Sequence, residues 1–170
     1  GIPINKQEAV KYYKLAADKG CTTAMTNYAI CLQNGDRILI NKEEALKYFK
    51  IAADNGNANA MNMYAYMNDH GDGIQTRKRE AVKYYKKAIE IGNQNAMYNY
   101  ALLIQNGNGV LVNKKDALKY YKMGADCGKS DSMNKYADML DKGDGVPVIK
   151  EEAFRNYIVK ISSSWKVSIF

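Results

Sequence analysis

The chain has 170 residues and a formal net charge of +7 at pH 7. No apolar run approaches the roughly 20 residues that a membrane-spanning helix needs, and no signal peptide opens the chain. The positive charge permits affinity for acidic partners without establishing it.

A strict period of 36 residues organises the sequence, with no insertion or deletion. The recurring features are an acid-Ala pair (from Glu8, Glu44, Glu80, Asp116 and Glu152), a methionine (Met25, Met61, Met97 and Met133), a Tyr-Ala pair (from Tyr28, Tyr64, Tyr100 and Tyr136) and a glycine (Gly35, Gly71, Gly107 and Gly143). A fixed period of this length is typical of stacked repeats, in which each unit buries its apolar face against its neighbours. We therefore expect an all-α solenoid of helix-turn-helix repeats that forms one array over residues 1–170.

In chain order, the pattern predicts a leading helix over residues 5–20, repeats at 21–56, 57–92, 93–128 and 129–164, and a tail at 165–170. Each repeat contains a first helix (A), a glycine loop and a second helix (B), and the leading helix is of the B type. Residues 1–5 match the middle of an inter-repeat loop at 37–41, which indicates a piece of a longer protein.

The helices show one apolar stripe each, at the helical period. In the first A helix the stripe comprises residues 24, 25, 28, 29 and 32, and in the first B helix residues 9, 12, 13, 16 and 17, so Tyr12 and Tyr13 are expected to be buried. B helices are expected to begin at capping asparagines, followed three residues later by an acid that favours the positive helix end. These asparagines are Asn5, Asn41 and Asn113, whereas Arg77 and Ile149 stand at the same position without a cap.

Glycines recur at the predicted helix ends and in the loops. Gly20, Gly56, Gly92 and Gly128 are expected to end the B helices. The loops GDRI, GDGI, GNGV and GDGV follow a helix and lack the remaining glycines or Lys-Ser/Thr of phosphate loops, so we interpret them as structural turns.

The end of the regular array is predicted near residue 164. Lys160, Ile161 and Ser164 replace the small residues that admit a following A helix, and residues 162–170, SSSWKVSIF, lack the A-helix motif. We expect this apolar tail to fold back on the last helix pair or to contact another molecule.

The three cysteines, Cys21, Cys31 and Cys127, are odd in number and form no CxxC pair. Cys21 and Cys31 would lie about 15 Å apart on one helix, which is too far for a disulfide. Reduced thiols favour a cytosolic or nuclear compartment, and we expect a cytoplasmic location.

The motif AMxxYA, a GxGV-type loop and EAxKYYKxAAxxG resembles the Sel-one-like repeat (Sel-like repeat, SLR) family, which is related to the tetratricopeptide repeats. The resemblance runs from about residue 5 to about residue 160 in five copies. It implies a right-handed superhelix of paired helices that serves as an adaptor in protein complexes, with the A helices on the concave side. Some secreted members have disulfides across the two helices of each repeat, and this chain lacks those cysteine pairs.

The A-helix face opposite the apolar stripe is the predicted binding surface, because there the repeats differ in sequence. Ile30, Tyr66 and Leu102 share one position, and an apolar strip rimmed by amides suits peptide recognition. The predicted partner-binding residues are Thr26, Asn27, Ile30, Gln33, Asn62, Met63, Tyr66, Tyr98, Asn99, Leu102, Gln105, Asn134, Lys135 and Asp138. The predicted function is a protein-interaction scaffold that binds a protein or peptide in the concave groove.

The alternative is a binder of acidic surfaces or nucleic acid that uses a lysine ridge on the outer face of the B helices. One column contains Lys11, Lys47, Lys83, Lys119 and Arg155, and the other Lys14, Lys50, Lys86 and Lys122. An acid four residues after each member of the second column partly neutralises it, and no aromatic residue is interleaved for stacking on bases, so nucleic acid is disfavoured.

An enzyme is not expected, because no convergent set of acids, bases or nucleophiles is found. The single histidine, His70, has no repeated carboxylate or cysteine partner, and Asp69 beside it is interpreted as an ordinary helix-end residue. No catalytic residue, metal ligand, cofactor or small-molecule substrate is predicted.

Overall fold

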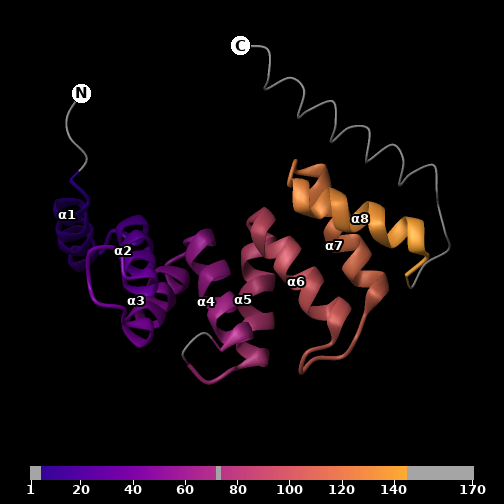
Figure 1. Cartoon of the computed structure of the whole chain (residues 1–170), viewed down its shortest axis with the longest axis horizontal. Coiled ribbons are helices and arrows are strands. Elements are labelled where there is room, and N and C mark those ends of the chain that lie inside the picture. The colour runs from indigo at the N-terminus through magenta and orange to yellow at the C-terminus, as the bar shows by residue number, and fades with distance from the viewer. Residues whose placement is uncertain (1–4, 72–73, 145–170) are drawn as a thin grey trace, which may run out of the picture. The chain divides into compact units, whose positions relative to one another are not determined.

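The computed structural model describes residues 5–71 and 74–144, and the regular secondary structure within these ranges consists of α-helices (Figure 1). The chain divides into two compact units, residues 1–93 and residues 94–170, which are described separately below. Every described helix contains 13 residues.

The first unit alternates B and A helices along the chain. In order these are α1 (Lys6–Asp18), α2 (Thr22–Asn34), α3 (Lys42–Asp54), α4 (Ala58–His70) and α5 (Lys78–Glu90). Each packs on the next, so α2 and α4 each lie against two B helices. The second unit contains α6 (Gln94–Asn106), α7 (Lys114–Asp126) and α8 (Ser130–Lys142), with α7 packed on both α6 and α8. The predicted all-α fold of helix-turn-helix repeats is confirmed, and the single array over residues 1–170 stays a prediction.

Small residues let the helices of the first unit approach closely. Five alanines are fully buried, and large aromatic rings fill the space between them: Ala29, Ala45, Ala52, Ala60 and Ala65. Close packing of this kind places dispersion contacts on every side of a buried ring. The predicted methionine column is buried at Met25, Met61 and Met97.

The predicted stripe is too narrow in the A helices and too wide in α1. The predicted stripe leaves out Cys31 and its 36-residue equivalents, yet the equivalents Met67, Leu103 and Met139 are buried. Conversely, the expected burial of Tyr12 and Tyr13 is wrong, because their side chains are 60% and 37% exposed. The reason is that α1 packs closely on α2 and touches α3 through the Tyr48–Asp18 contact near its end, which leaves much of its surface open.

The predicted N-caps of the B helices are confirmed. The side-chain oxygens of Asn5, Asn41 and Asn113 accept the backbone N–H three residues later at 3.1, 3.0 and 3.0 Å. Arg77 makes no such bond, as expected. Sequence reasoning missed a further cap at Asn57, whose side chain accepts the Ala60 N–H at 2.9 Å and begins an A helix.

Each described glycine loop is closed at its base by one backbone hydrogen bond, here called the loop clasp. The N–H of Asn41, Arg77 and Asn113 donates to the carbonyl of Leu32, Asn68 and Ile104, at 2.9, 2.8 and 2.8 Å. The chain turns into the loop at glycines with positive φ, and a Cβ at Gly71 (φ 68°) would also lie 2.6 Å from Cγ2 of Thr76. These loops are therefore structural turns, as predicted.

Predictions about the last part of the chain lie outside the described residues. They concern the missing cap at Ile149, the ridge position Arg155, and the tail at 162–170. Within the described ranges, no helix combines the length and apolar character that crossing a bilayer requires.

Candidate partner-binding faces

The first unit carries the predicted face on α2 and α4. Asn27, Ile30 and Gln33 on α2, and Met63 and Tyr66 on α4, are half-buried, so part of each side chain is accessible to a partner. The Asn27 amide and the Tyr66 hydroxyl make no side-chain hydrogen bond to any described residue. An amide that both donates and accepts, beside partly exposed apolar surface, is the chemistry that recognises an extended peptide.

The expected exposure is wrong for two of the predicted residues. Thr26 and Asn62 are buried, with 5% and 6% of their surface exposed. The Thr26 hydroxyl donates to the Thr22 carbonyl of its own helix at 2.8 Å. Both residues lie on A helices that contact a B helix on either side, so the buried arc is wider than a single stripe on a helical wheel predicts.

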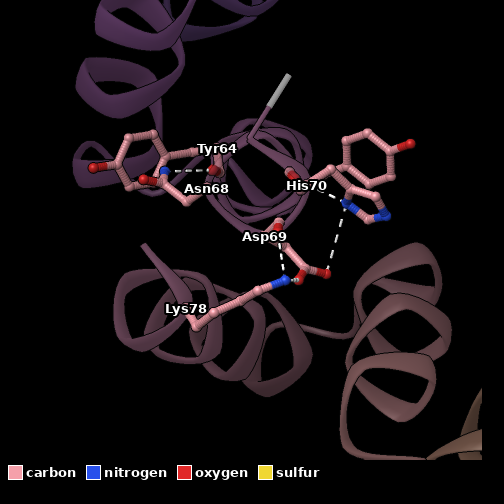
Figure 2. A network of polar contacts seen from close by, with 6 residues as sticks. Tyr64, Asn68, Asp69, His70 and Lys78 are labelled. Carbon is pink, nitrogen blue, oxygen red and sulfur yellow. Dashed lines mark hydrogen bonds and ion pairs between the residues drawn. The ribbon is translucent and has the colours of Figure 1, made fainter. Parts of the chain in front are cut away.

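A polar network at the end of α4 supports this face (Figure 2). Asp69, interpreted from the sequence as an ordinary helix-end residue, is buried and accepts from the Lys78 ammonium at 2.6 Å. The same ammonium donates to the Asp69 carbonyl at 2.5 Å, so it ties the end of α4 to the start of α5. His70 stacks on Tyr66 with 4.0 Å between ring centroids, and its Nδ1 lies 3.1 Å from the Tyr66 carbonyl oxygen. The network thereby holds the Tyr66 ring in place.

Burial is the main influence on the pKa of Tyr85, a residue of α5 near Asp69. The Tyr85 side chain is fully buried and its hydroxyl has no hydrogen-bond partner. Burial, followed by the nearby Asp69 carboxylate, raises the pKa of Tyr85 well above its ordinary value of 10.0. Tyr85 therefore stays neutral and acts as packing for the repeat.

The second unit carries the other predicted residues on α6 and α8. Tyr98, Asn99, Leu102, Gln105 and Lys135 are half-buried, and Asn134 and Asp138 are exposed. Tyr98 is held between two neighbours, since its ring lies 5.8 Å from the Tyr121 ring and 5.5 Å from the Lys129 ammonium.

Both polar atoms of the Gln105 amide are occupied by hydrogen bonds within the unit. Its amide oxygen accepts from the Tyr121 hydroxyl at 2.9 Å, and its amide nitrogen donates to Asp144 at 3.2 Å. Asp144 also pairs with Lys114, the first residue of α7. Gln105 therefore fastens the A helix to the B helix, which is the task that Asp69 performs one repeat earlier.

Part of the lysine ridge is used inside the fold, in a contact here called the Tyr-Asp-Lys latch. The Tyr84 hydroxyl donates to Asp54 Oδ1 at 2.5 Å, and the Lys50 ammonium lies 2.6 Å from Asp54 Oδ2. The same arrangement one repeat earlier has Tyr48 at 3.4 Å and Lys14 at 3.0 Å from the Asp18 carboxylate. The latch thus links the end of one B helix to the next B helix.

The latch shifts the pKa values of its members in the directions expected of a hydrogen-bonded acid. Hydrogen bonds from Lys50 and Tyr84 lower the pKa of Asp54 below its ordinary value of 3.8. Burial, and then the bond to Asp54, raises the pKa of Tyr84 to about 12. Lys50 and Lys14 are therefore already paired, which weakens the case for a continuous cationic ridge.

No metal site emerges in the described part of the chain. No group of three or more His, Cys, Asp or Glu side chains there is placed to hold a metal ion. Cys21, Cys31 and Cys127 are free thiols, and burial raises the pKa of Cys31, so this thiol is less reactive than an exposed one.

These features define a class, the helical repeat proteins in which successive A and B helices pack pairwise. The family model for the Sel1 repeat matches five consecutive segments, residues 1–21, 22–57, 58–93, 94–129 and 130–158. The chain belongs to the Sel1 repeat family.

Solved structures show the same fold. A Sel1 repeat protein from Oxalobacter formigenes is 28% identical with a TM-score of 0.86, over 94% of this chain and 65% of that one. The protein c5321, a protective antigen of uropathogenic Escherichia coli with an SLR fold, is 26% identical with a TM-score of 0.87, over 95% of this chain and 35% of that one. Helicobacter pylori cysteine rich protein B has a TM-score of 0.61 at 20% identity, over 75% of this chain and 95% of that one. The chain thus spans less than two thirds of the length of the first two proteins. No curated protein matches the sequence.

Proposed function

We propose that the chain is a protein-interaction module without enzymatic activity, which binds an extended segment of a partner protein on its A-helix face. The observation that carries the proposal is the accessible set on α2 and α4, namely Asn27, Ile30, Met63 and Tyr66. Membership of the Sel1 repeat family supports it, since such repeats generally mediate protein interactions.

The chemistry of the face supports a peptide ligand. Tyr66 offers a ring fixed by His70 and a hydroxyl without a partner in the described residues, so it can bury a ligand side chain and still bond the ligand backbone. A rigid aromatic anchor of this kind costs little conformational entropy on binding and is the residue type that dominates interface energies. The Asn27 amide can pair with both an N–H and a carbonyl of the ligand backbone.

The second unit offers a related set. Asn99 and Leu102 occupy on α6 the positions of Met63 and Tyr66, and Lys135 on α8 could meet a carboxylate. In the proposal, Asn99 and Lys135 offer polar contacts and Leu102 an apolar one on the face of the second unit, and Tyr66 is the rigid anchor on the face of the first.

The test is affinity capture with the intact chain, followed by titration of each captured protein. We expect Tyr66→Ala and Asn27→Ala each to raise the Kd at least about tenfold, which is roughly 1.4 kcal/mol. The matched controls are Lys83→Ala and Lys119→Ala, on the outer column of the B helices, and these should leave the Kd within about twofold. Circular dichroism at 222 nm would confirm that all four variants fold. The proposal fails if the outer variants lose the partner while both face variants keep it.

A further inference from the structure

A cleft on the first unit lies outside the proposed A-helix face. It has a volume of about 390 Å³ and is formed by one side of α3, by Tyr64 of α4, and by residues 74–77, which precede α5. Its lining residues are Glu43, Leu46, Lys47, Lys50, Tyr64, Ile74, Gln75 and Arg77. Figure 2 shows Tyr64 and His70 on opposite sides of α4. Tyr64 lines the cleft and His70 stacks on Tyr66, so the cleft and the Tyr66 face lie on different sides of this helix.

The cations of this cleft differ in their bonding. Lys50 is held by Asp54 in the Tyr-Asp-Lys latch. The side chains of Lys47 and Arg77, in contrast, have no ion pair or hydrogen bond with any described residue, and both are exposed. Arg77 stands where three other B helices have a capping asparagine, so it forgoes a stabilising cap at the mouth of the cleft. Two cationic groups without a partner therefore converge on one hollow.

The remaining lining limits which anion fits. Leu46 and Ile74 are half-buried and give the cleft an apolar wall. Glu43 adds one negative charge, which would repel a polyanionic backbone more than it repels a single carboxylate. Tyr64 is only 3% exposed, so it offers no ring face on which a base could stack.

A related hollow lies one repeat earlier. It has a volume of about 360 Å³ and is lined by Asn5, Lys6, Gln7 and Arg37. Like the first cleft, it is lined by a B helix and by an arginine that follows the next A helix.

We propose that the cleft between α3 and residues 74–77 binds an acidic segment of a partner protein, in which a carboxylate side chain meets Lys47 and Arg77 and an adjacent apolar side chain packs on Leu46 and Ile74. Guanidinium groups bind carboxylates with two parallel hydrogen bonds, which makes Arg77 the orienting contact. Lys47 adds attraction without a fixed geometry. This site does not depend on the proposed A-helix face.

The experiment uses the full chain and a short fluorescein-labelled peptide in which glutamate alternates with leucine, titrated by fluorescence anisotropy at low salt. The variant pair Lys47→Gln with Arg77→Asn removes both unpaired cations. Arg77→Asn places at this position the residue that caps three other B helices, and circular dichroism at 222 nm checks that the variant pair is folded. The matched control, Lys11→Gln with Lys119→Gln, removes two positive charges as well, from two members of the Lys47 column that do not line the cleft.

We expect the cleft pair to weaken peptide binding at least about tenfold, and Glu43→Gln to strengthen it about two- to threefold because a like charge is removed. The control pair and Tyr66→Ala should stay within about twofold of the wild type, which separates this site from the proposed function. Equal weakening by the two pairs would show only a general effect of charge and would overturn the proposal. It would also be overturned if the peptide did not bind, if a glutamine-leucine peptide bound as well, or if a single-stranded oligothymidine bound as tightly with the same dependence on Lys47 and Arg77.

Discussion

The contact between α7 and α8 gives the sharpest test of how the repeats pack. Equivalent positions in the first unit are Ala52 and Ala60, both fully buried. In the second unit these are Gly124 and Ser132. A Cβ added at Gly124 would lie 2.9 Å from the Ser132 Cβ and closer still to its hydroxyl oxygen. That oxygen is buried without a hydrogen-bond partner.

The expected energies follow from these positions. Gly124→Ala should gain about 1 kcal/mol of helix propensity but cost about 2–3 kcal/mol by overpacking, which leaves a net loss of roughly 1–2 kcal/mol. Ser132→Ala should stabilise by about 1 kcal/mol, because it removes an unpaired buried hydroxyl. In the double variant the nearest clashing atom is absent, so the two changes should couple favourably by at least about 1 kcal/mol and leave the stability within about 1 kcal/mol of the wild type.

Urea unfolding of the four proteins, followed by circular dichroism at 222 nm, measures the cycle. The midpoints are comparable provided that the m-values agree, since a changed m would indicate partial unfolding of the repeats. A stabilising Gly124→Ala single variant, or a coupling energy near zero, would refute the reasoning because it would mean that the close approach of α7 and α8 is not constrained by these two residues.

Three further outcomes are expected in the same assay. Tyr100→Ala should cost about 3–5 kcal/mol of stability, because this buried ring packs edge-to-face on Tyr120 with 5.0 Å between the ring centroids. Lys119→Ala should change stability by less than about 0.5 kcal/mol. Similar unfolding midpoints for the two variants would contradict the assignment of buried and solvent-facing sides. Arg77→Asn should add about 1 kcal/mol by capping α5, and an unchanged midpoint would argue against a capped start there. Asp54→Asn should destabilise the protein at neutral pH. Because the pKa of Asp54 is lower in the folded state than its ordinary value of 3.8, the contribution of this carboxylate to stability is fully present above pH 3.8 and is lost as the pH falls through the folded-state pKa. The gap between wild type and variant should therefore narrow on acidification, and a constant gap would mean that the latch does not titrate.

Sequence periodicity was sufficient to predict the described helices, the asparagine caps of the B helices and the turning glycines, because each of these is decided by a few neighbouring residues repeated at one spacing. The Asn57 cap of α4 was missed. The A-helix face was predicted less well. A helical wheel treats a helix as packed on one side, and Thr26 and Asn62 are buried because α2 and α4 are packed on two.

The 36-residue period does not predict features that depend on one repeat alone or that need residues from two repeats. The Asp69–Lys78 pair joins a helix end to the start of the next helix across a loop, and a helical wheel, which treats one helix at a time, does not bring these residues together. The cleft at Lys47 and Arg77 combines an exposed helix position with a loop residue 30 positions later, and nothing in the order of residues shows that their side chains face one hollow. A consensus of the repeats does not show residues that differ from one repeat to the next, and a binding site arises most readily from such residues.

The loop clasp has a consequence for how this sequence can change. Because one backbone bond closes each loop at its base, the residues beyond it carry little of the packing, and Leu39 and Leu111 there are 90% and 92% exposed. Insertions or exchanged segments at these tips would leave the helix register unaltered, since the clasp involves no side chain. The three loops closed in this way can therefore diversify, or accept a grafted label, independently of their helices.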